Sequence, residues 1–188
     1  MLSKESPKAG RGETLAFANY PKQEILLPVK GSFIFFSLIM ALLLNLLPLK
    51  GVVLTLWPDF IALVVLYWCI NQPQRVGMST AFGMGLLMDV SNASTFGQHA
   101  LAYSIMAFAA LVLHRRLRVF GLLKQAPQIG LMLLIGQSVI LLTGLLDGSH
   151  FPGWDFFLAS ATGTLLWPLL SSLLRISQRS KSDSDALS

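Results

Sequence analysis

The sequence predicts an all-α membrane protein, a polytopic bundle of six transmembrane helices. Hydrophobic residues make up 54% of the 188 residues and charged residues only 12%, whereas soluble domains carry about 25% charged residues. The apolar residues form long runs, without the alternation of polar and apolar positions that a membrane β-barrel needs. The basic residues collect in every second connection between these runs, as the positive-inside rule predicts for helical membrane proteins.

Six apolar segments follow one another along the chain, over residues 32–48, 57–72, 75–90, 98–114, 126–146 and 154–175. A helix needs about 20 residues to cross a hydrocarbon layer about 30 Å thick. The second and third segments are shorter and depend on interfacial aromatics and local thinning of the bilayer. We expect a disordered cytoplasmic tail over residues 1–30, a six-helix membrane domain over 31–176 and a second cytoplasmic tail over 177–188.

The charges predict the orientation of the helices. With both termini in the cytoplasm, 13 of the 14 basic residues lie on the cytoplasmic side, and Lys50 lies outside. The outer connections carry the acids Asp59, Asp89, Asp147 and Asp155. The net charge of +5 then marks a face that meets anionic lipid. No soluble basic patch with interleaved aromatics indicates a nucleic-acid partner.

Asp59 follows Pro58 at the start of the second segment. Proline suits the first position of a helix, and an acid in the first turn meets the positive end of the helix dipole. We therefore expect a helix to start here near the outer headgroups, with Trp57 at the interface and residues 48–56 as an extended linker. The alternative begins the helix at Gly51 and leaves Asp59 deep in the bilayer, where an acid is a functional-site candidate.

Small residues recur every four positions along the third segment and end at an aspartate: Gly77, Ala81, Gly85 and Asp89. Residues at this spacing lie along one ridge of a helix, and small side chains let helices approach closely in lipid. The ridge is interpreted as packing within the bundle or, alternatively, as a docking site. Asp89 is expected near the outer surface and reachable from the periplasm, as is Asp59.

Other polar or bulky residues inside apolar segments indicate packing. Trp167 and Pro168 in the sixth segment indicate a kink with a groove nearby. Asn45 and Gln137 are interpreted as side chains that bond across helices, in preference to a role in ligand binding.

No pattern in the sequence predicts catalysis, a metal or a cofactor. The histidines His99, His114 and His150 lie near the ends of different segments, and the single Cys69 lies in an apolar run, so a metal-ligand spacing is absent. Ser138 lacks the glycine spacing of a nucleophile elbow, and the sequence contains no phosphate-binding loop or dinucleotide fingerprint. We therefore expect a protein that is not an enzyme and binds no cofactor.

Several longer motifs occur together, namely LWPDF, LYW, QPQRVG, AFGMGLLMDVSNASTFGQHAL, KQAPQ and GTLLWPLL. In this combination the chain resembles the bacterial rod-shape-determining MreD family over roughly residues 33–176. Arg75 and Gly97 lie within these motifs. Trp57 stands where a basic residue is common before the proline, so no salt bridge is expected there. The polar N-terminal lead is longer than is usual in the family.

The resemblance implies a non-enzymatic scaffold of the cell-elongation machinery in the bacterial inner membrane, which helps to maintain rod shape and lateral peptidoglycan synthesis. It implies binding to MreC, a single-span protein with a periplasmic domain. It also implies direct or indirect association with MreB, with RodA and with its partner penicillin-binding transpeptidase. The candidate docking or packing residues are Pro58, Asp59, Arg75, Gly77, Ala81, Gly85, Asp89, Gly97, Trp167 and Pro168.

The resemblance further implies a fold similar to the substrate-binding subunit of energy-coupling-factor transporters. This analogy suggests an alternative function, a small-solute-binding membrane transport subunit, although fold alone is a weak argument for function. Such a subunit needs a cavity at the membrane midplane with convergent polar groups. The only candidates for these groups are Asn45, Gln137 and a deeply placed Asp59.

Overall fold

The computed structural model describes residues 30–92 and 96–185, and the regular elements in these ranges are all helices. They are α2 (Gly31–Asn45), α3 (Val52–Leu56), α4 (Phe60–Asn71), α5 (Met78–Ser91), α6 (Gln98–Val119), α7 (Leu122–Leu146), the 3-10 helix η2 (Trp154–Phe157) and α8 (Leu158–Asp185). The all-helical class is confirmed for this part of the chain. The tail expected over residues 1–30 lies outside the described residues except for Lys30, and so do the last three residues of the chain.

Hydrogen bonds join the end of one long helix to the start of another. These contacts show that successive long helices run in alternating directions. Asn45 at the end of α2 bonds Asp59 before α4, and Asp89 near the end of α5 bonds backbone groups at the start of α6. Gln98 at the start of α6 likewise bonds the Ile140 carbonyl near the end of α7. The bundle therefore has two ends.

We call the two ends of the bundle the acidic end and the basic end. The acidic end carries Asp59, Asp89, Asp147 and Asp155. The basic end carries Lys30, Arg75, Arg115, Arg116, Arg118, Lys124 and Arg175. For the charged side chains within residues 30–177 that the structure describes, the separation expected from the sequence is therefore present in three dimensions, with Lys50 as the exception.

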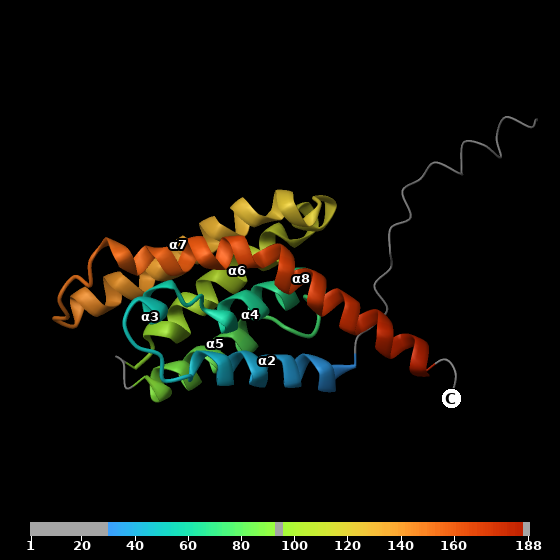
Figure 1. Ribbon diagram of the computed structural model, residues 1–188, viewed down its shortest axis with the longest axis horizontal. Coiled ribbons are helices and arrows are strands. Elements are labelled where there is room, and N and C mark those ends of the chain that lie inside the picture. Colours follow the sequence, from blue (N-terminus) through green and yellow to red (C-terminus); the bar gives the residue numbers. More distant parts are fainter. Residues whose placement is uncertain (1–29, 93–95, 186–188) are drawn as a thin grey trace, which may run out of the picture.

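α4 forms the centre of the bundle (Figure 1). Each of its residues from Ile61 to Asn71 is buried, and α2, α5, α6 and α8 pack around it. A helix that is apolar on all sides is expected where every face is covered. Its aromatic residues contact one another and α8, since Tyr67 lies 5.1 Å from Trp68 and 6.3 Å from Trp167 between ring centroids.

Among the residues that the structure describes, four helical stretches are long and apolar enough to cross a membrane, namely Val52–Asn71, Gln98–Val119, Leu122–Leu146 and Trp154–Ser177. α2 is apolar but has 15 residues, and α5 has 14. At about 1.5 Å per residue, α5 is about 21 Å long, which is shorter than the hydrocarbon layer. The number of six spans therefore stays a prediction.

The start of the second segment differs from the expectation. Val52–Leu56 is a short helix and not an extended linker, and a new helix begins after Asp59. The break has a local cause, because the residue before a proline is disfavoured in the helical region, and Trp57 has extended backbone angles. Pro58 therefore lies one residue before the N-cap of α4 and not in its first turn.

Candidate functional site

Asp59 lies in a polar cluster at the acidic end, between α2, α4 and α6. Its Oδ1 accepts hydrogen bonds from the Ala62 backbone N–H at 3.0 Å and from Asn45 Nδ2 at 2.8 Å. Its Oδ2 accepts from the Tyr103 hydroxyl at 2.6 Å. Asn45 in turn accepts from the Phe60 backbone N–H at 3.0 Å. Two side chains thus satisfy N–H groups at the start of α4 that have no partner within the helix.

Asp89 lies close to this cluster and is 1% exposed. Its carboxylate accepts hydrogen bonds from the backbone N–H groups of Gly97 at 2.9 Å, His99 at 2.8 Å and Ala100 at 3.3 Å. It also contacts Nδ1 of His99 at 2.8 Å. A carboxylate in this position satisfies the unpaired N–H groups of α6 and meets the positive end of its dipole. Asp89 is therefore not reachable from solvent, contrary to the expectation.

The two acids are connected through the first turns of α6. His99 contacts Asp89, Tyr103 contacts Asp59, and the two rings lie 6.0 Å apart in an edge-to-face arrangement. Tyr103 is not among the candidate residues predicted from the sequence. The signal that could have found it is its spacing, because residues four apart share one helix face.

The ridge of small residues in α5 faces α6. Ala81 is fully buried. A Cβ atom on Gly85 would lie 2.4 Å from Ala100 Cα and 2.7 Å from the carbonyl carbon of His99, so the two backbones are in direct contact. Gly77 is the N-cap residue of α5 and has open space around it. Among the ridge positions, Ala81, Gly85 and Asp89 are thus engaged within the bundle.

Gly97 is the N-cap residue of α6. Its backbone has left-handed angles, with φ at +97°, and residues with a side chain are disfavoured there. This conformation directs its N–H toward Asp89. At the other end of the bundle, Arg75 lies in the connection between α4 and α5, and its Nη1 is 3.7 Å from a Cβ built on Gly31. The structure therefore places Arg75 beside the start of α2 and two residues before Gly77, at the opposite end of the bundle from Asp59 and Asp89.

Trp167 and Pro168 lie inside α8, and Trp167 is 1% exposed. The indole N–H of Trp167 donates to Gln125 Oε1 at 3.4 Å, and its ring contacts Tyr67. Gln125 itself donates to the carbonyls of Leu117 at 2.8 Å and Phe120 at 3.0 Å. Trp167 thus points into the bundle, where it supports the side chain that closes the end of α6.

Arg118 is a second structural residue that is not among the candidates predicted from the sequence. Its Nε donates to the Ile70 carbonyl at 2.7 Å, and its Nη2 donates to the Asn71 carbonyl. These are the last carbonyls of α4. A cation at a helix C-terminus is favoured by the dipole. No local sequence signal could have found this contact, because 48 residues separate Arg118 from Ile70.

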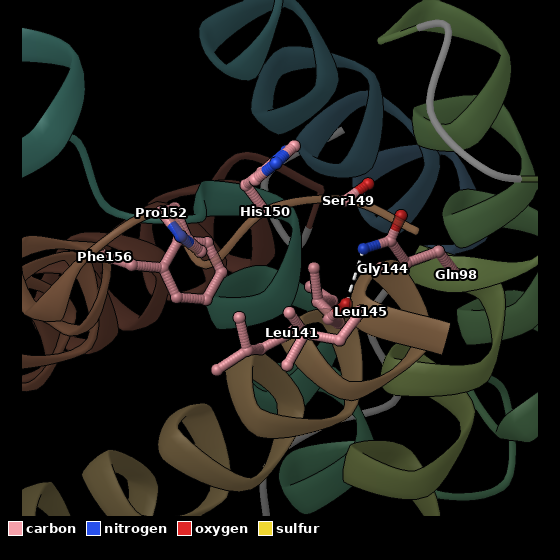
Figure 2. A pocket seen from close by; sticks show the side chains of 9 residues that line it. Gln98, Leu141, Gly144, Leu145, Ser149, His150, Pro152 and Phe156 are labelled. Carbon is pink, nitrogen blue, oxygen red and sulfur yellow. Dashed lines mark hydrogen bonds between the residues drawn. The ribbon is translucent and has the colours of Figure 1, made fainter. Parts of the chain in front are cut away.

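A pocket of about 200 Å³ lies at the acidic end, between the start of α6, the end of α7 and the connection to η2 (Figure 2). Leu141, Leu145 and Phe156 form its apolar walls, and Gln98 and Ser149 add polar groups. Small-molecule sites usually have volumes of about 300–1,000 Å³. The pocket is smaller than that and lies at one end of the bundle, away from the midplane.

The polar groups that a midplane site would need are engaged with the protein. Asn45 and Asp59 bond each other, as described above. Gln137 accepts from the Ser160 hydroxyl and donates to the Phe156 carbonyl at 3.0 Å. In the described ranges, no three His, Cys, Asp or Glu side chains group as a metal site requires.

Comparison with known proteins gives the family. The model of the rod shape-determining protein MreD family matches residues 29–177, which include all the helices described above except the last turns of α8. The chain belongs to the MreD family. Rod shape-determining protein MreD of Haemophilus influenzae is 30% identical over 137 residues, which are 73% of this chain and 85% of the relative. No solved structure matches the chain, so the likeness to energy-coupling-factor subunits stays a prediction.

Membership of the MreD family and the apolar helices together indicate a multi-pass membrane protein of rod-shape determination. The resemblance stated from the sequence is therefore confirmed. The motifs between Pro58 and Leu101 correspond to α4, α5 and the start of α6, the helices that Asp59 and Asp89 connect.

Proposed function

We propose that this protein is a non-enzymatic scaffold of the cell-elongation machinery, which holds the transmembrane helix of MreC and through it the associated synthases and MreB. Membership of the MreD family carries this proposal. The geometry of the polar groups supports it. Asp89 and Arg118 bond backbone groups of neighbouring helices, and Asp59 bonds the side chains of Asn45 and Tyr103 on neighbouring helices, so all three contribute to the framework of the bundle.

The outward face of α8 is the surface that we propose for the partner helix. Leu165, Leu169, Leu173 and Ile176 are 64–78% exposed and follow one another at intervals of four, four and three residues. They form one apolar stripe along the helix. Ala81 is buried and Gly85 packs on α6, so neither is available to a partner, which leaves α8 as the favoured surface of the two that the sequence suggested.

We propose that the basic end faces the cytoplasm, with both termini on that side, in the bacterial inner membrane. The separation of charges between the two ends supports this orientation, because basic residues are enriched on the cytoplasmic side of membrane proteins. The acidic end and its pocket then face the periplasm.

Site-specific photocrosslinking in growing cells tests the partner surface. A photoreactive amino acid at Leu169 should capture MreC, whereas the same residue at Val112, which is 63% exposed on α6, should not. Equal capture at both positions, or capture at Val112 alone, would show that α8 is not the partner surface. Leu169→Trp should also weaken capture of MreC and round the cells while the protein remains folded and membrane-inserted.

The small-solute transport function receives no support from the geometry. Its three candidate polar groups, Asn45, Gln137 and Asp59, are occupied by intramolecular bonds. The pocket at the acidic end lies away from the midplane and is small. Specific binding of a defined solute by the purified protein would reinstate this function.

A further inference from the structure

Besides Arg118, the end of α6 and the first turn of α7 carry three exposed cations and two exposed apolar side chains. We call this group the basic tip: Arg115, Arg116, Val119, Leu123 and Lys124. Val119 is 83% exposed and Leu123 is 79% exposed, and the three cationic residues are also exposed. In the ranges whose side chains are described, 30–92 and 96–177, no acidic residue lies at this end of the bundle.

The basic tip is fixed by its neighbours and is not a loose loop. Arg118 bonds the last carbonyls of α4, and Gln125 bonds the Leu117 and Phe120 carbonyls. These two side chains satisfy the backbone groups around the connection. Within residues 30–92 and 96–177, no acidic side chain pairs with the exposed cations on either side, so these cations are open to a ligand from outside the bundle.

The length of α6 places the basic tip at the level of the lipid headgroups. α6 has 22 residues and is therefore about 33 Å long, close to the thickness of the hydrocarbon layer of about 30 Å. If α6 enters at Gln98, Arg115 and Arg116 lie in the last turn before the headgroups. Long cationic side chains in this position extend toward the lipid phosphates while their stems remain in the apolar layer.

We propose that the basic tip is a binding site for anionic phospholipid. The guanidinium and ammonium groups would bind the headgroup phosphate, and Val119 and Leu123 would contact the upper acyl chains. This combination of cations and apolar side chains fits a lipid better than a free anion, which gains nothing from Val119 or Leu123. The inference rests on insertion in a membrane and does not depend on binding to MreC.

Native mass spectrometry of the purified full chain in detergent tests the site, with phosphatidylglycerol or phosphatidylcholine as the added lipid. The wild type should bind phosphatidylglycerol preferentially. The triple variant Arg115→Gln, Arg116→Gln, Lys124→Gln should lose about fivefold in affinity per cation, or about 100-fold in total. Equal binding of the two lipids by the wild type would overturn the proposal.

A charge-matched control separates a local site from net charge. The variant Lys50→Gln, Arg179→Gln, Lys181→Gln removes the same charge and should keep its preference for phosphatidylglycerol. Equal losses in the two triple variants would overturn the local site in favour of diffuse attraction.

The apolar part of the tip has its own test, which leaves every cation in place. Val119→Gln with Leu123→Gln should also weaken phosphatidylglycerol binding, and soluble glycerol phosphate should not compete with the lipid. Unchanged lipid binding in this double variant, or competition by glycerol phosphate, would show that the tip binds anions without recognising a lipid.

Discussion

Replacing Gly85 with alanine tests the close approach of α5 and α6. The added Cβ would lie 2.4 Å from Ala100 Cα and 2.5 Å from Ala100 N, whereas non-bonded carbon atoms prefer about 3.5–4.0 Å. Both contacts are to backbone atoms, so no side-chain rotation can relieve them. The helices must therefore separate by more than about 1 Å at this point.

The separation would also weaken the bonds of Asp89, which joins the same two helices. Its contact with Ala100 N is already 3.3 Å long, and its contacts with Gly97 N and His99 N would lengthen as well. Overpacking costs about 1–3 kcal/mol, and lost hydrogen bonds to a charged group cost about 1.5–3 kcal/mol. We therefore expect Gly85→Ala to lower the free energy of unfolding by about 3–5 kcal/mol.

Gly83 provides a matched control two positions away in the same helix. A Cβ on Gly83 meets nothing within 4 Å, so Gly83→Ala should be neutral or should stabilise the protein by up to about 1 kcal/mol through helix propensity. The measurement is unfolding of the detergent-solubilised protein with a rising fraction of sodium dodecyl sulfate, followed by circular dichroism. Unfolding of Gly85→Ala at the same fraction of sodium dodecyl sulfate as the wild type would contradict the close approach of α5 and α6. Equal losses of stability in the two variants would contradict it as well.

Three further substitutions test individual bonds in the same assay. Tyr103→Phe removes the hydroxyl that donates to Asp59 and should cost about 1–3 kcal/mol; wild-type stability would show that this bond contributes nothing. Arg118→Gln exposes the final carbonyls of α4 and should cost about 1.5–3 kcal/mol, whereas Lys50→Gln at an exposed position should change stability by less than about 0.5 kcal/mol. Gly148→Ala forces a side chain into the left-handed region, at φ +86°, and should cost about 1–2 kcal/mol; a smaller loss would mean that the turn after α7 relaxes freely.

The helical class and the charged ends of the bundle are largely predictable, because many residues along the chain each contribute to the same hydrophobic and charge pattern. Apolar runs and the positions of lysine and arginine gave the helical class and the two charged ends. The helix start at Asp59 was predictable from the local sequence, since a proline and an acid mark such starts. The preceding helix was missed because the β-branched residues Val52 and Val53 favoured an extended path, although Gly51, with φ at +63°, and tertiary packing allow a helical turn.

The bonding of the two acids could not be predicted, because each bond depends on chain segments that are distant in sequence. Tyr103 lies 44 residues from Asp59. Asp89 reaches the start of α6 only because Gly85 lets the helices touch. The spacing of four in α5 predicted a packing ridge but could not distinguish α6 from a partner protein as the surface that the ridge contacts.

One physical requirement explains why the buried polar residues lie where they do. α4 has 12 residues and is about 18 Å long, so at least one of its ends would lie inside a hydrocarbon layer about 30 Å thick. Unpaired backbone groups at such ends cost several kcal/mol each, because no water is present to bond them.

Neighbouring helices supply the missing partners. Asn45 of α2 bonds an N–H group at the start of α4 beside the N-cap residue Asp59, and Arg118 of α6 bonds the carbonyls at its end. The short central helix is therefore stable only when α2 and α6 are in place. A substitution in this polar framework should unfold the protein before it affects any partner, whereas a substitution on the outer face of α8 should affect the partner first. Comparing membrane abundance with cell shape for Arg118→Gln and Leu169→Trp separates the two effects, and a folded, abundant Arg118→Gln protein that fails to bind MreC would contradict this division.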